Sequence, residues 1–252
     1  MRGVLLILAA LMLGAPAAAA LSERDLARAV ARPPDGARLP ASVSFIDGGG
    51  QRIDLGRLAG GRPLVLLFAD YTCRHVCAPG LALTAGALSD TGLAAGRDYR
   101  LAVVGFDPRD TAGDARRMAA QLAQTPAVAR ATTMLTGDAA SVAAATRALG
   151  YGYVYDRDSD QFAHDAVVYV FASDGRLSTL LPELGLTPTT LRAALTGGAT
   201  PSESFAARVA HLCYGFAAAH GRFGRAVVVG LQALSALLIA LAATWFFRRR
   251  AA

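Results

Sequence analysis

The 252-residue sequence contains no lysine, and charged residues make up only 17% of it. Soluble globular domains usually carry about a quarter of charged residues, so this composition argues against an ordinary soluble enzyme. An intrinsically disordered chain is also excluded, because 54% of the residues are apolar. The scarcity of charge therefore predicts at least one segment that lies in a membrane. We assign no functional role to the absence of lysine itself.

A clustered basic surface is also missing from the body of the chain. The formal net charge is +6, but Arg2 and the arginines at 248–250 lie in the terminal segments. Without these four residues, the remaining 21 of the 25 arginines face 19 acidic residues. Proteins that bind nucleic acid concentrate positive charge on one face. We therefore expect no nucleic-acid partner.

The first 20 residues have the organisation of a secretory signal peptide. Arg2 precedes an apolar stretch, which ends in four consecutive alanines. This order predicts cleavage before Leu21 and export of the rest of the chain, with residues 21–34 as an exposed lead segment. An uncleaved N-terminal anchor is the alternative, and it would place a glycine and a proline within the bilayer.

The other end of the chain contains an uncharged run over residues 226–247. As a helix, this run would extend roughly 33 Å at about 1.5 Å per residue, which is long enough to span a bilayer. Arginines follow directly, so the positive-inside rule places residues 248–252 in the cytoplasm. We therefore predict a single C-terminal pass in the cell (inner) membrane, with the preceding chain in the periplasm or its equivalent. A buried core helix is the alternative interpretation.

Residues 35–196 read as one globular domain, and residues 197–225 as a linker and membrane-proximal segment. Strands and helices are expected to alternate along the domain, after an initial hairpin over 42–55. The hairpin is expected to turn at the sequence DGGG over 47–50, and the expected strands are 64–68, 101–106, 166–172 and 177–181. The expected helices are 76–89, 112–124, 139–149 and 187–195, with Asp110 or Thr111 as the cap of the second and Asp138 as the cap of the third. This order, with a cysteine pair directly after the first buried strand, predicts an α/β, thioredoxin-like sandwich followed by a C-terminal transmembrane helix.

The cysteine pair consists of Cys73 and Cys77, at the point where a strand ends and a helix is expected to begin. Four residues apart, the two thiols would share one helix face, and the positive end of the helix would lower their pKa. Such a pair can close a disulfide in an oxidising compartment or bind a soft metal such as Cu(I). A structural disulfide is the alternative, although so short a loop constrains the unfolded chain little.

His164 stands just before the expected strand over 166–172, and this edge of a thioredoxin-like sheet lies near the cysteine turn. Two thiolates and one imidazole form a ligand set that copper accepts, whereas structural zinc usually takes four protein ligands. Cys73, Cys77 and His164 are therefore the candidate copper ligands. A histidine at a strand start otherwise serves as a hydrogen-bonded or surface residue. We expect His75, between the cysteines, to face solvent.

Taken together, these motifs resemble the Sco/SenC family over roughly residues 40–196. The resemblance rests on the hairpin, the CxxxC pair, the sequence DPRDT at 107–111, the sequence GYGYVY at 150–155, and His164 before an apolar strand. It implies a thioredoxin-like fold and a membrane-tethered copper chaperone, or a thiol-disulfide protein, in assembly of the dinuclear copper site of cytochrome c oxidase. The chain departs from the family where Arg74 and Ala78 stand in place of the prolines that often follow the two cysteines, and in its C-terminal anchor.

The resemblance implies that Cys73, Cys77 and His164 hold Cu(I) or Cu(II) for delivery to the copper-site subunit of the oxidase. A copper-donor protein and a thiol reductant would then be further partners. The alternative is an enzyme, a thiol-disulfide oxidoreductase that reduces the copper-ligand cysteines of the oxidase, with Cys73 attacking and Cys77 resolving. Both functions need the same cysteine pair, whereas only copper binding needs His164.

Several polar residues outside this set remain open. Asp107 is either an orienting partner of the site or a turn former before Pro108. Cys213, with His211 and His220, lies close to the predicted membrane segment. Cys213 is interpreted as a packing residue, with a copper relay or a dimer-linking thiol as the alternatives.

Overall fold

The computed structural model describes residues 21–73, 77–157, 160–183 and 185–198, together with Gln232, Leu234, Ser235 and Ile239. The chain divides into two units, of which Arg24–Leu212 contains the fold that follows. The predicted signal peptide, the segment 199–225 with Cys213, and nearly all of the predicted membrane helix lie outside the described residues. Within the described part of the chain, no helix combines the length and the apolar character needed to cross a bilayer.

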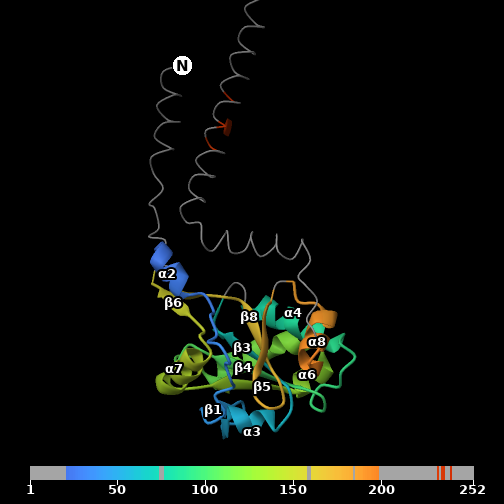
Figure 1. Ribbon diagram of the computed structural model, residues 1–252. Helices are drawn as coiled ribbons and strands as arrows, with labels where there is room; N and C mark the ends of the chain where they lie inside the picture. The colour runs from blue at the N-terminus through green and yellow to red at the C-terminus, as the bar shows by residue number, and fades with distance from the viewer. Residues whose placement is uncertain are drawn as a thin grey trace, which may run out of the picture. The chain divides into compact units, whose positions relative to one another are not determined.

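A seven-stranded mixed sheet forms the centre of this unit (Figure 1). Its strands are, in spatial order, β2 (Arg52–Asp54), β1 (Ser44–Asp47), β5 (Thr132–Thr136), β4 (Arg100–Gly105), β3 (Leu64–Ala69), β8 (Val167–Phe171) and β9 (Leu177–Pro182). The three central strands β5, β4 and β3 are parallel, and β1 and β8 pair antiparallel at either side. The carboxyl ends of the parallel strands therefore meet at one edge of the sheet.

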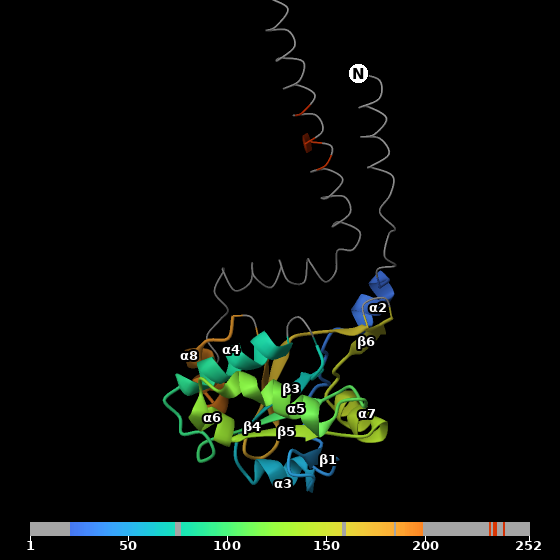
Figure 2. The same cartoon turned by 180° about the vertical axis from the view of Figure 1, so that it is seen from behind.

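Helices cover both faces of the sheet (Figures 1 and 2). One face packs on α4 (Cys77–Ser89), α5 (Ala112–Ala119), α6 (Pro126–Arg130) and α8 (Pro188–Thr196), and the other on α3 (Leu55–Ala59) and α7 (Ala139–Ala148). Successive side chains of a strand point to opposite faces. Accordingly, Val65 and Leu67 enter the first core, while Leu64 and Leu66 enter the second. The α/β sandwich predicted from the sequence is confirmed in its class and is consistent with a thioredoxin-like arrangement.

A separate two-stranded ribbon, formed by β6 (Tyr153–Asp156) and β7 (Gln161–His164), stands outside the main sheet. Its antiparallel register pairs Tyr153 with His164. This ribbon was not predicted from the sequence, nor were β5, α3, α6 and the short helix α2 (Glu23–Arg28). The helix predicted over 112–124 is α5 followed by a 3-10 turn over Ala120–Leu122. The ribbon matters most for function, because its last residue is His164.

The helix starts follow side-chain capping. Asp138 accepts a hydrogen bond from the Ser141 backbone nitrogen at 2.8 Å and begins α7, as predicted. At α5 the sequence allowed either Asp110 or Thr111 as the cap, and the structure uses Thr111 in a reciprocal capping box with Asp114. This leaves Asp110 available for another contact.

The segment 21–34, expected to be an exposed lead, is in part buried. Ala29 and Ala31 are 6% and 9% exposed, and the Arg32 backbone nitrogen donates to the Gly150 carbonyl at 2.7 Å. Gly150 has φ +59°, and a Cβ added there would lie 1.9 Å from the Arg32 carbonyl oxygen. Gly150 lets the end of the lead segment pack directly beside Tyr151, while most of the segment is exposed or half-buried.

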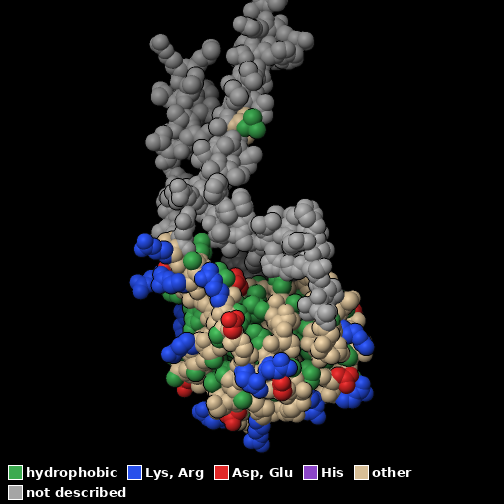
Figure 3. Space-filling view, viewed as in Figure 1, with side chains coloured by type: hydrophobic (Ala, Val, Ile, Leu, Met, Phe, Trp, Pro, Cys, Tyr) green, Lys and Arg blue, Asp and Glu red, His purple; other side chains and the backbone are tan. Residues whose placement is uncertain are grey.

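Charged side chains on the surface pair locally. On the face seen in Figure 3, arginines gather near α2 and elsewhere stand among acidic side chains. Arg97 pairs with Asp98 at 2.8 Å and Arg176 with Asp174 at 2.7 Å, and all four side chains are solvent-exposed or half-buried. Exposed pairs of this kind contribute little to stability.

Candidate metal centre

Cys73 and Cys77 lie at the carboxyl end of β3. Cys73 precedes the helix, and its backbone nitrogen donates to the Asp70 carbonyl at 3.1 Å. Cys77 is the first residue of α4 and is 6% exposed. Cys73 itself is not helical, so the two cysteines do not lie on one helix face as expected, although their thiols are hydrogen-bonded. Neither Cys73 nor Cys77 forms a disulfide, and His75 lies outside the described residues.

The pKa of the Cys77 thiol is raised above its ordinary value rather than lowered. The main cause is its hydrogen bond with the Cys73 thiol, followed by burial. We had expected the positive end of the helix to favour the thiolate, but sharing a proton with a neighbouring sulfur and leaving water both favour the neutral form. A metal that binds here must displace this proton.

The ribbon brings His164 to the cysteines. Its Nε2 lies 3.7 Å from the Cys77 Sγ, across 87 positions of the chain. We call Cys73, Cys77 and His164 the donor cluster. The structure thus brings the histidine and the helix cysteine into contact, and the second cysteine is hydrogen-bonded to the first.

The other ring nitrogen of His164 faces two oxygen atoms. Nδ1 lies 2.8 Å from the Tyr151 hydroxyl oxygen and 3.0 Å from the Asp165 carbonyl oxygen. The Tyr151 hydroxyl also donates to the same carbonyl at 3.4 Å. A carbonyl oxygen can only accept, so this arrangement favours a proton on Nδ1. The Nε2 lone pair is then directed at the sulfur, as in histidines that bind metals.

Aromatic rings surround the imidazole on its other sides. The Phe106 ring centroid lies 5.1 Å from that of His164 in an edge-to-face arrangement, and Tyr151 stacks on Phe68 at 4.5 Å. Phe106, Phe68 and Tyr151 are all buried. The sequence analysis did not identify Tyr151 as a partner of His164. Its only signal was the GYGYVY sequence, which served there as part of a family resemblance.

Three carboxylates lie beside the donor cluster, after the ends of β3 and β4. They belong to Asp70, Asp107 and Asp110, which we call the acidic cluster, and their nearest oxygens lie within 4.8 Å of one another. Asp70 accepts two hydrogen bonds from Thr72, each 2.8 Å long. Although their spacing could suit a cation, each of these carboxylates already accepts at least one hydrogen bond within the protein.

Asp107 acts as a turn former. Its carboxylate accepts from the Arg109 backbone nitrogen at 2.9 Å and from the Arg109 guanidinium at 2.8 Å. Of the two roles left open by the sequence, the contacts recorded among the described residues fit the turn and not the orientation of His164, which Tyr151 provides.

Asp110 holds the loop before the cysteines. Its Oδ2 accepts a hydrogen bond from the Tyr71 backbone nitrogen at 3.1 Å, while the buried Oδ1 has no partner in the described structure. Burial raises the pKa of Asp110 to about 7, and the neighbouring carboxylates of Asp70 and Asp107 act in the same direction. The Tyr71 hydroxyl in turn bonds to the Val103 and Leu135 carbonyls, which fixes the loop to the sheet.

Arg109 joins the acidic cluster to the ribbon. Its guanidinium lies 3.5 Å from the Asp160 carboxylate and over the Tyr155 and Phe162 rings, at 5.2 and 5.9 Å from their centroids. A shallow pocket of about 350 Å³ lies between these residues and Thr72. The loop after β4 thereby helps to hold the element that carries His164.

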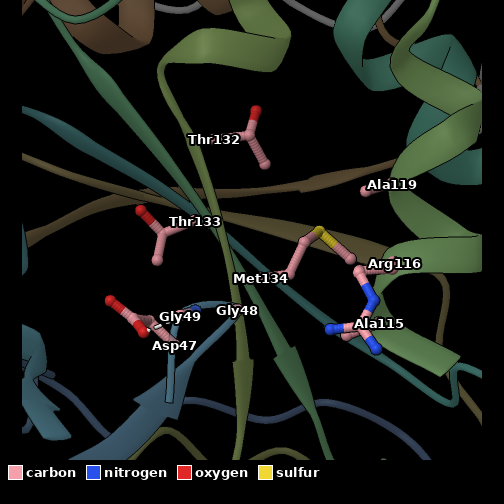
Figure 4. A pocket seen from close by; sticks show the side chains of 9 residues that line it. All are labelled: Asp47, Gly48, Gly49, Ala115, Arg116, Ala119, Thr132, Thr133 and Met134. Carbon is pink, nitrogen blue, oxygen red and sulfur yellow. Dashed lines mark hydrogen bonds between the residues drawn. The ribbon is translucent and has the colours of Figure 1, made fainter. Parts of the chain in front are cut away.

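Another pocket, of about 270 Å³, lies at a different place in the fold (Figure 4). It is formed by the turn after β1 together with α5 and β5, and its lining includes Asp47, Arg116 and Met134. Figure 4 shows no member of the donor cluster among its lining side chains. The chemistry predicted from the sequence therefore belongs to the edge after β3 rather than to this pocket.

The donor cluster fits copper by its chemistry. Thiol sulfurs select soft ions such as Cu(I), and imidazole nitrogen suits both Cu(I) and Cu(II). A closed structural zinc site would usually need a fourth protein ligand, a further cysteine or histidine. In addition, the aromatic wall limits access of water to the histidine side of the cluster.

Comparison with known proteins agrees with this geometry. The SCO1/SenC family model matches residues 32–200. A SCO1/SenC family lipoprotein from Bacillus anthracis is 17% identical with a TM-score of 0.54, covering 66% of this chain and 98% of its own. BsSco, a member of the Sco family of cytochrome c oxidase assembly proteins, is 19% identical with a TM-score of 0.53, covering 66% and 95%.

Arabidopsis thaliana ScoI, solved with copper bound, is 20% identical with a TM-score of 0.51, covering 64% of this chain and 96% of its own. At these identities the likeness shows a shared fold. No curated protein sequence matches the chain. Because the family model spans well over half of the sequence, and its range contains the whole sheet and the donor cluster, the chain belongs to the SCO1/SenC family.

Proposed function

We propose that this protein binds copper on Cys73, Cys77 and His164 and delivers it to the dinuclear copper site of cytochrome c oxidase during assembly. The observation that supports this most directly is the 3.7 Å contact between Cys77 Sγ and His164 Nε2. The solved ScoI with copper bound and the description of BsSco as an oxidase assembly protein agree with it. The partners would be the copper-site subunit, a copper donor and a thiol reductant.

The donor cluster suits a cargo that must be taken up and released. The raised pKa of Cys77 keeps its thiol protonated in the metal-free protein, so copper binding releases a proton. Imidazole contributes to both oxidation states, while the sulfurs favour Cu(I). Copper held in this way can pass to another set of thiolates by exchange of ligands, without unfolding of the sheet.

Copper analysis of the full chain under reducing conditions tests the proposal. We expect one copper per native chain, and loss of copper in Cys73→Ser and Cys77→Ser, because hydroxyl is a poor ligand for Cu(I). The thermal unfolding midpoint of each metal-free variant checks that the fold persists. One copper per chain in the double variant would place the site elsewhere and contradict the assignment.

The proposal includes a membrane anchor, with the copper-binding domain on the periplasmic or extracytoplasmic side. Its basis is the uncharged run over 226–247 with arginines directly after it. A reporter that is active only outside the cytoplasm should work when fused after residue 200 and fail when fused after Ala252. An active fusion at the C-terminus alone would reverse the orientation.

A thiol-disulfide oxidoreductase is the second candidate, favoured by the hydrogen bond between the two thiols, which form no disulfide. His164→Ala separates the two functions, because dithiol exchange needs only the cysteines. As a chaperone, this variant should lose oxidase assembly at limiting copper and retain exchange with a model disulfide. Normal assembly with this variant would favour the reductase.

A further inference from the structure

Glu183 is a buried acid beside the donor cluster that neither the motifs nor the proposed function uses. It follows β9 directly and is 7% exposed. Its backbone nitrogen donates to the Ala166 carbonyl at 2.9 Å, two residues after His164. The backbone of Glu183 is thereby fixed next to the end of the ribbon.

The Glu183 side chain lies against the first turns of α4. A Cβ added to Gly80 would come within 1.8 Å of the Glu183 Oε2 and 2.9 Å of its Cδ. Gly80 is three positions after Cys77, and residues at this spacing lie on the same side of a helix. The carboxylate therefore occupies space that only a glycine at position 80 leaves open, on the side of α4 that carries Cys77.

The electrostatic neighbours of Glu183 are members of the same site. Burial and then the Cys73 sulfur raise the pKa of Glu183 to about 8. The Glu183 charge is in turn a smaller cause of the raised pKa of Cys77, after Cys73 and burial, and of the raised pKa of the Tyr151 phenol, after burial. These couplings agree with the geometry at Gly80, which places the carboxylate on the side of α4 that carries Cys77.

This carboxylate lacks the partners that other buried acids have. Asp70, Asp107 and Asp114 all accept hydrogen bonds from backbone or side-chain donors. In the described part of the chain, no hydrogen bond or ion pair to the Glu183 carboxylate is found. Removal of a carboxylate from water is costly, and a nearby cation compensates this cost.

We propose that Glu183 supplies a carboxylate oxygen as a fourth donor when the site holds Cu(II), and so shifts the preference of this protein from Cu(I) toward Cu(II). The inference rests on the proposed copper site. Two sulfurs and one nitrogen satisfy Cu(I), whereas Cu(II) prefers four donors and accepts harder nitrogen and oxygen ligands. A bound dication would also be the partner that the carboxylate lacks.

Glu183→Gln tests the proposal, because it keeps the size of the side chain and removes the charge. Titration of the full chain with Cu(II) should show a loss of affinity of roughly tenfold or more, with a changed copper hyperfine splitting in the EPR spectrum. The affinity for Cu(I), measured by competition with a chelator, should change less than twofold. A tenfold change in this ratio raises the one-electron potential by about 59 mV. An unchanged Cu(II) affinity and EPR spectrum would overturn the proposal.

Two further variants guard against an indirect effect. Gly80→Ala keeps the acid but displaces it, and it should weaken Cu(II) binding in the same direction. Asp114→Asn removes another buried carboxylate, which belongs to the capping box of α5, and should leave the EPR spectrum native. If Glu183→Gln fails to fold, as judged by its thermal unfolding, Gly80→Ala decides alone, and native Cu(II) binding in that variant would refute the role of Glu183.

The same experiments separate this inference from the proposed function. If Cys77→Ser loses copper while Glu183→Gln binds Cu(II) like the native protein, only the proposal that Glu183 is a fourth donor is refuted. If Cys77→Ser retains copper, the proposed copper site itself is refuted, and with it the role of Glu183.

Discussion

The donor cluster and the acidic cluster lie at the same edge of the sheet, after β3 and its neighbours, but their polar atoms are satisfied differently. The acidic cluster receives hydrogen bonds from Thr72, from Arg109 and from the Tyr71 backbone nitrogen. In the donor cluster, the Cys77 thiol contacts the other two donors, Cys73 and His164, and the Asp70 backbone. Neighbouring groups with similar burial can thus have different roles: the acidic cluster stabilises loops, whereas the donor cluster carries the proposed metal ligands.

The comparison between the two clusters can be sharpened first at Tyr151, where we expect the largest effect, a loss of copper affinity. Tyr151→Phe removes the hydroxyl that lies beside His164 Nδ1 and keeps the ring in the core. Outer-sphere partners of this kind are worth roughly ten- to a hundredfold in metal affinity. We therefore expect a loss of copper affinity in this range, measured by chelator competition.

The matched control is Tyr153→Phe in the same ribbon. The Tyr153 ring packs on Phe106 at 5.0 Å, and no hydrogen bond of its hydroxyl is found among the described residues. Copper affinity should stay close to native. Equal losses in the two variants would mean that His164 is positioned by ring packing alone.

A smaller effect, on stability rather than on copper, is expected at Arg109. Arg109→Ala leaves the Asp107 carboxylate, which is 3% exposed, without its cationic partner, and it also removes the contacts with the ribbon. The thermal unfolding midpoint of the metal-free protein should fall, because a buried acid without its partner is destabilising.

Arg97→Ala provides the reference for this prediction. Arg97 forms an exposed pair with Asp98, so its loss should change the midpoint little. The difference between the unfolding midpoints of the two variants measures how much burial of the acidic partner adds to the stabilisation by an ion pair. Similar midpoints in Arg109→Ala and Arg97→Ala would show that the Arg109–Asp107 pair stabilises the fold no more than the exposed Arg97–Asp98 pair.

The smallest expected effect is a pH dependence at Asp110. Burial raises its pKa from 3.8 to about 7, so the folded state holds this proton more tightly than the unfolded state. The free energy of unfolding of the native protein should therefore fall as pH rises from about 4 to 7, and this contribution is then constant. In Asp110→Asn, urea unfolding should show a smaller fall over this window.

Asp174→Asn should have the opposite effect on the free energy of unfolding, because it removes a contribution that increases as pH rises. The Arg176 side chain lowers the pKa of Asp174, so its contribution is present above the ordinary pKa and is lost as pH falls. The raised pKa of Glu183 also makes the free energy of unfolding fall as pH rises, up to about pH 8, and this contribution is the same in both variants. A native pH profile in Asp110→Asn would argue against a buried, protonated acid at this position.

Much of the main sheet could be predicted, because strong local signals mark it. The continuous apolar runs of β3 and β4, the glycine-rich turn between β1 and β2, and the Asp138 cap were each recognised from a few adjacent residues. β5 was missed because its sequence, TTMLT, has neither a continuous apolar run nor a regular alternation. Its position between β1 and β4 depends on tertiary pairing.

The candidate site was predictable only in part, for a related reason. Cys73, Cys77 and His164 could be chosen by residue type and family resemblance, and the structure brings Cys77 and His164 together. The partners Tyr151 and Glu183 are ordinary residues in the sequence, and they gain their roles from contacts between distant segments. The thiol pKa was predicted with the wrong sign, because burial and the neighbouring sulfur outweigh the helix end.

The division of the donor cluster between two elements sets an order in which a cargo would be released. Both cysteines follow a central strand of a seven-stranded sheet, whereas His164 ends a ribbon of two strands. A two-stranded ribbon has little stability of its own and opens more readily than a sheet core. With copper bound as proposed, the imidazole would therefore be the donor that detaches first, and the sulfurs would keep the copper with one side open to an incoming thiolate of the acceptor.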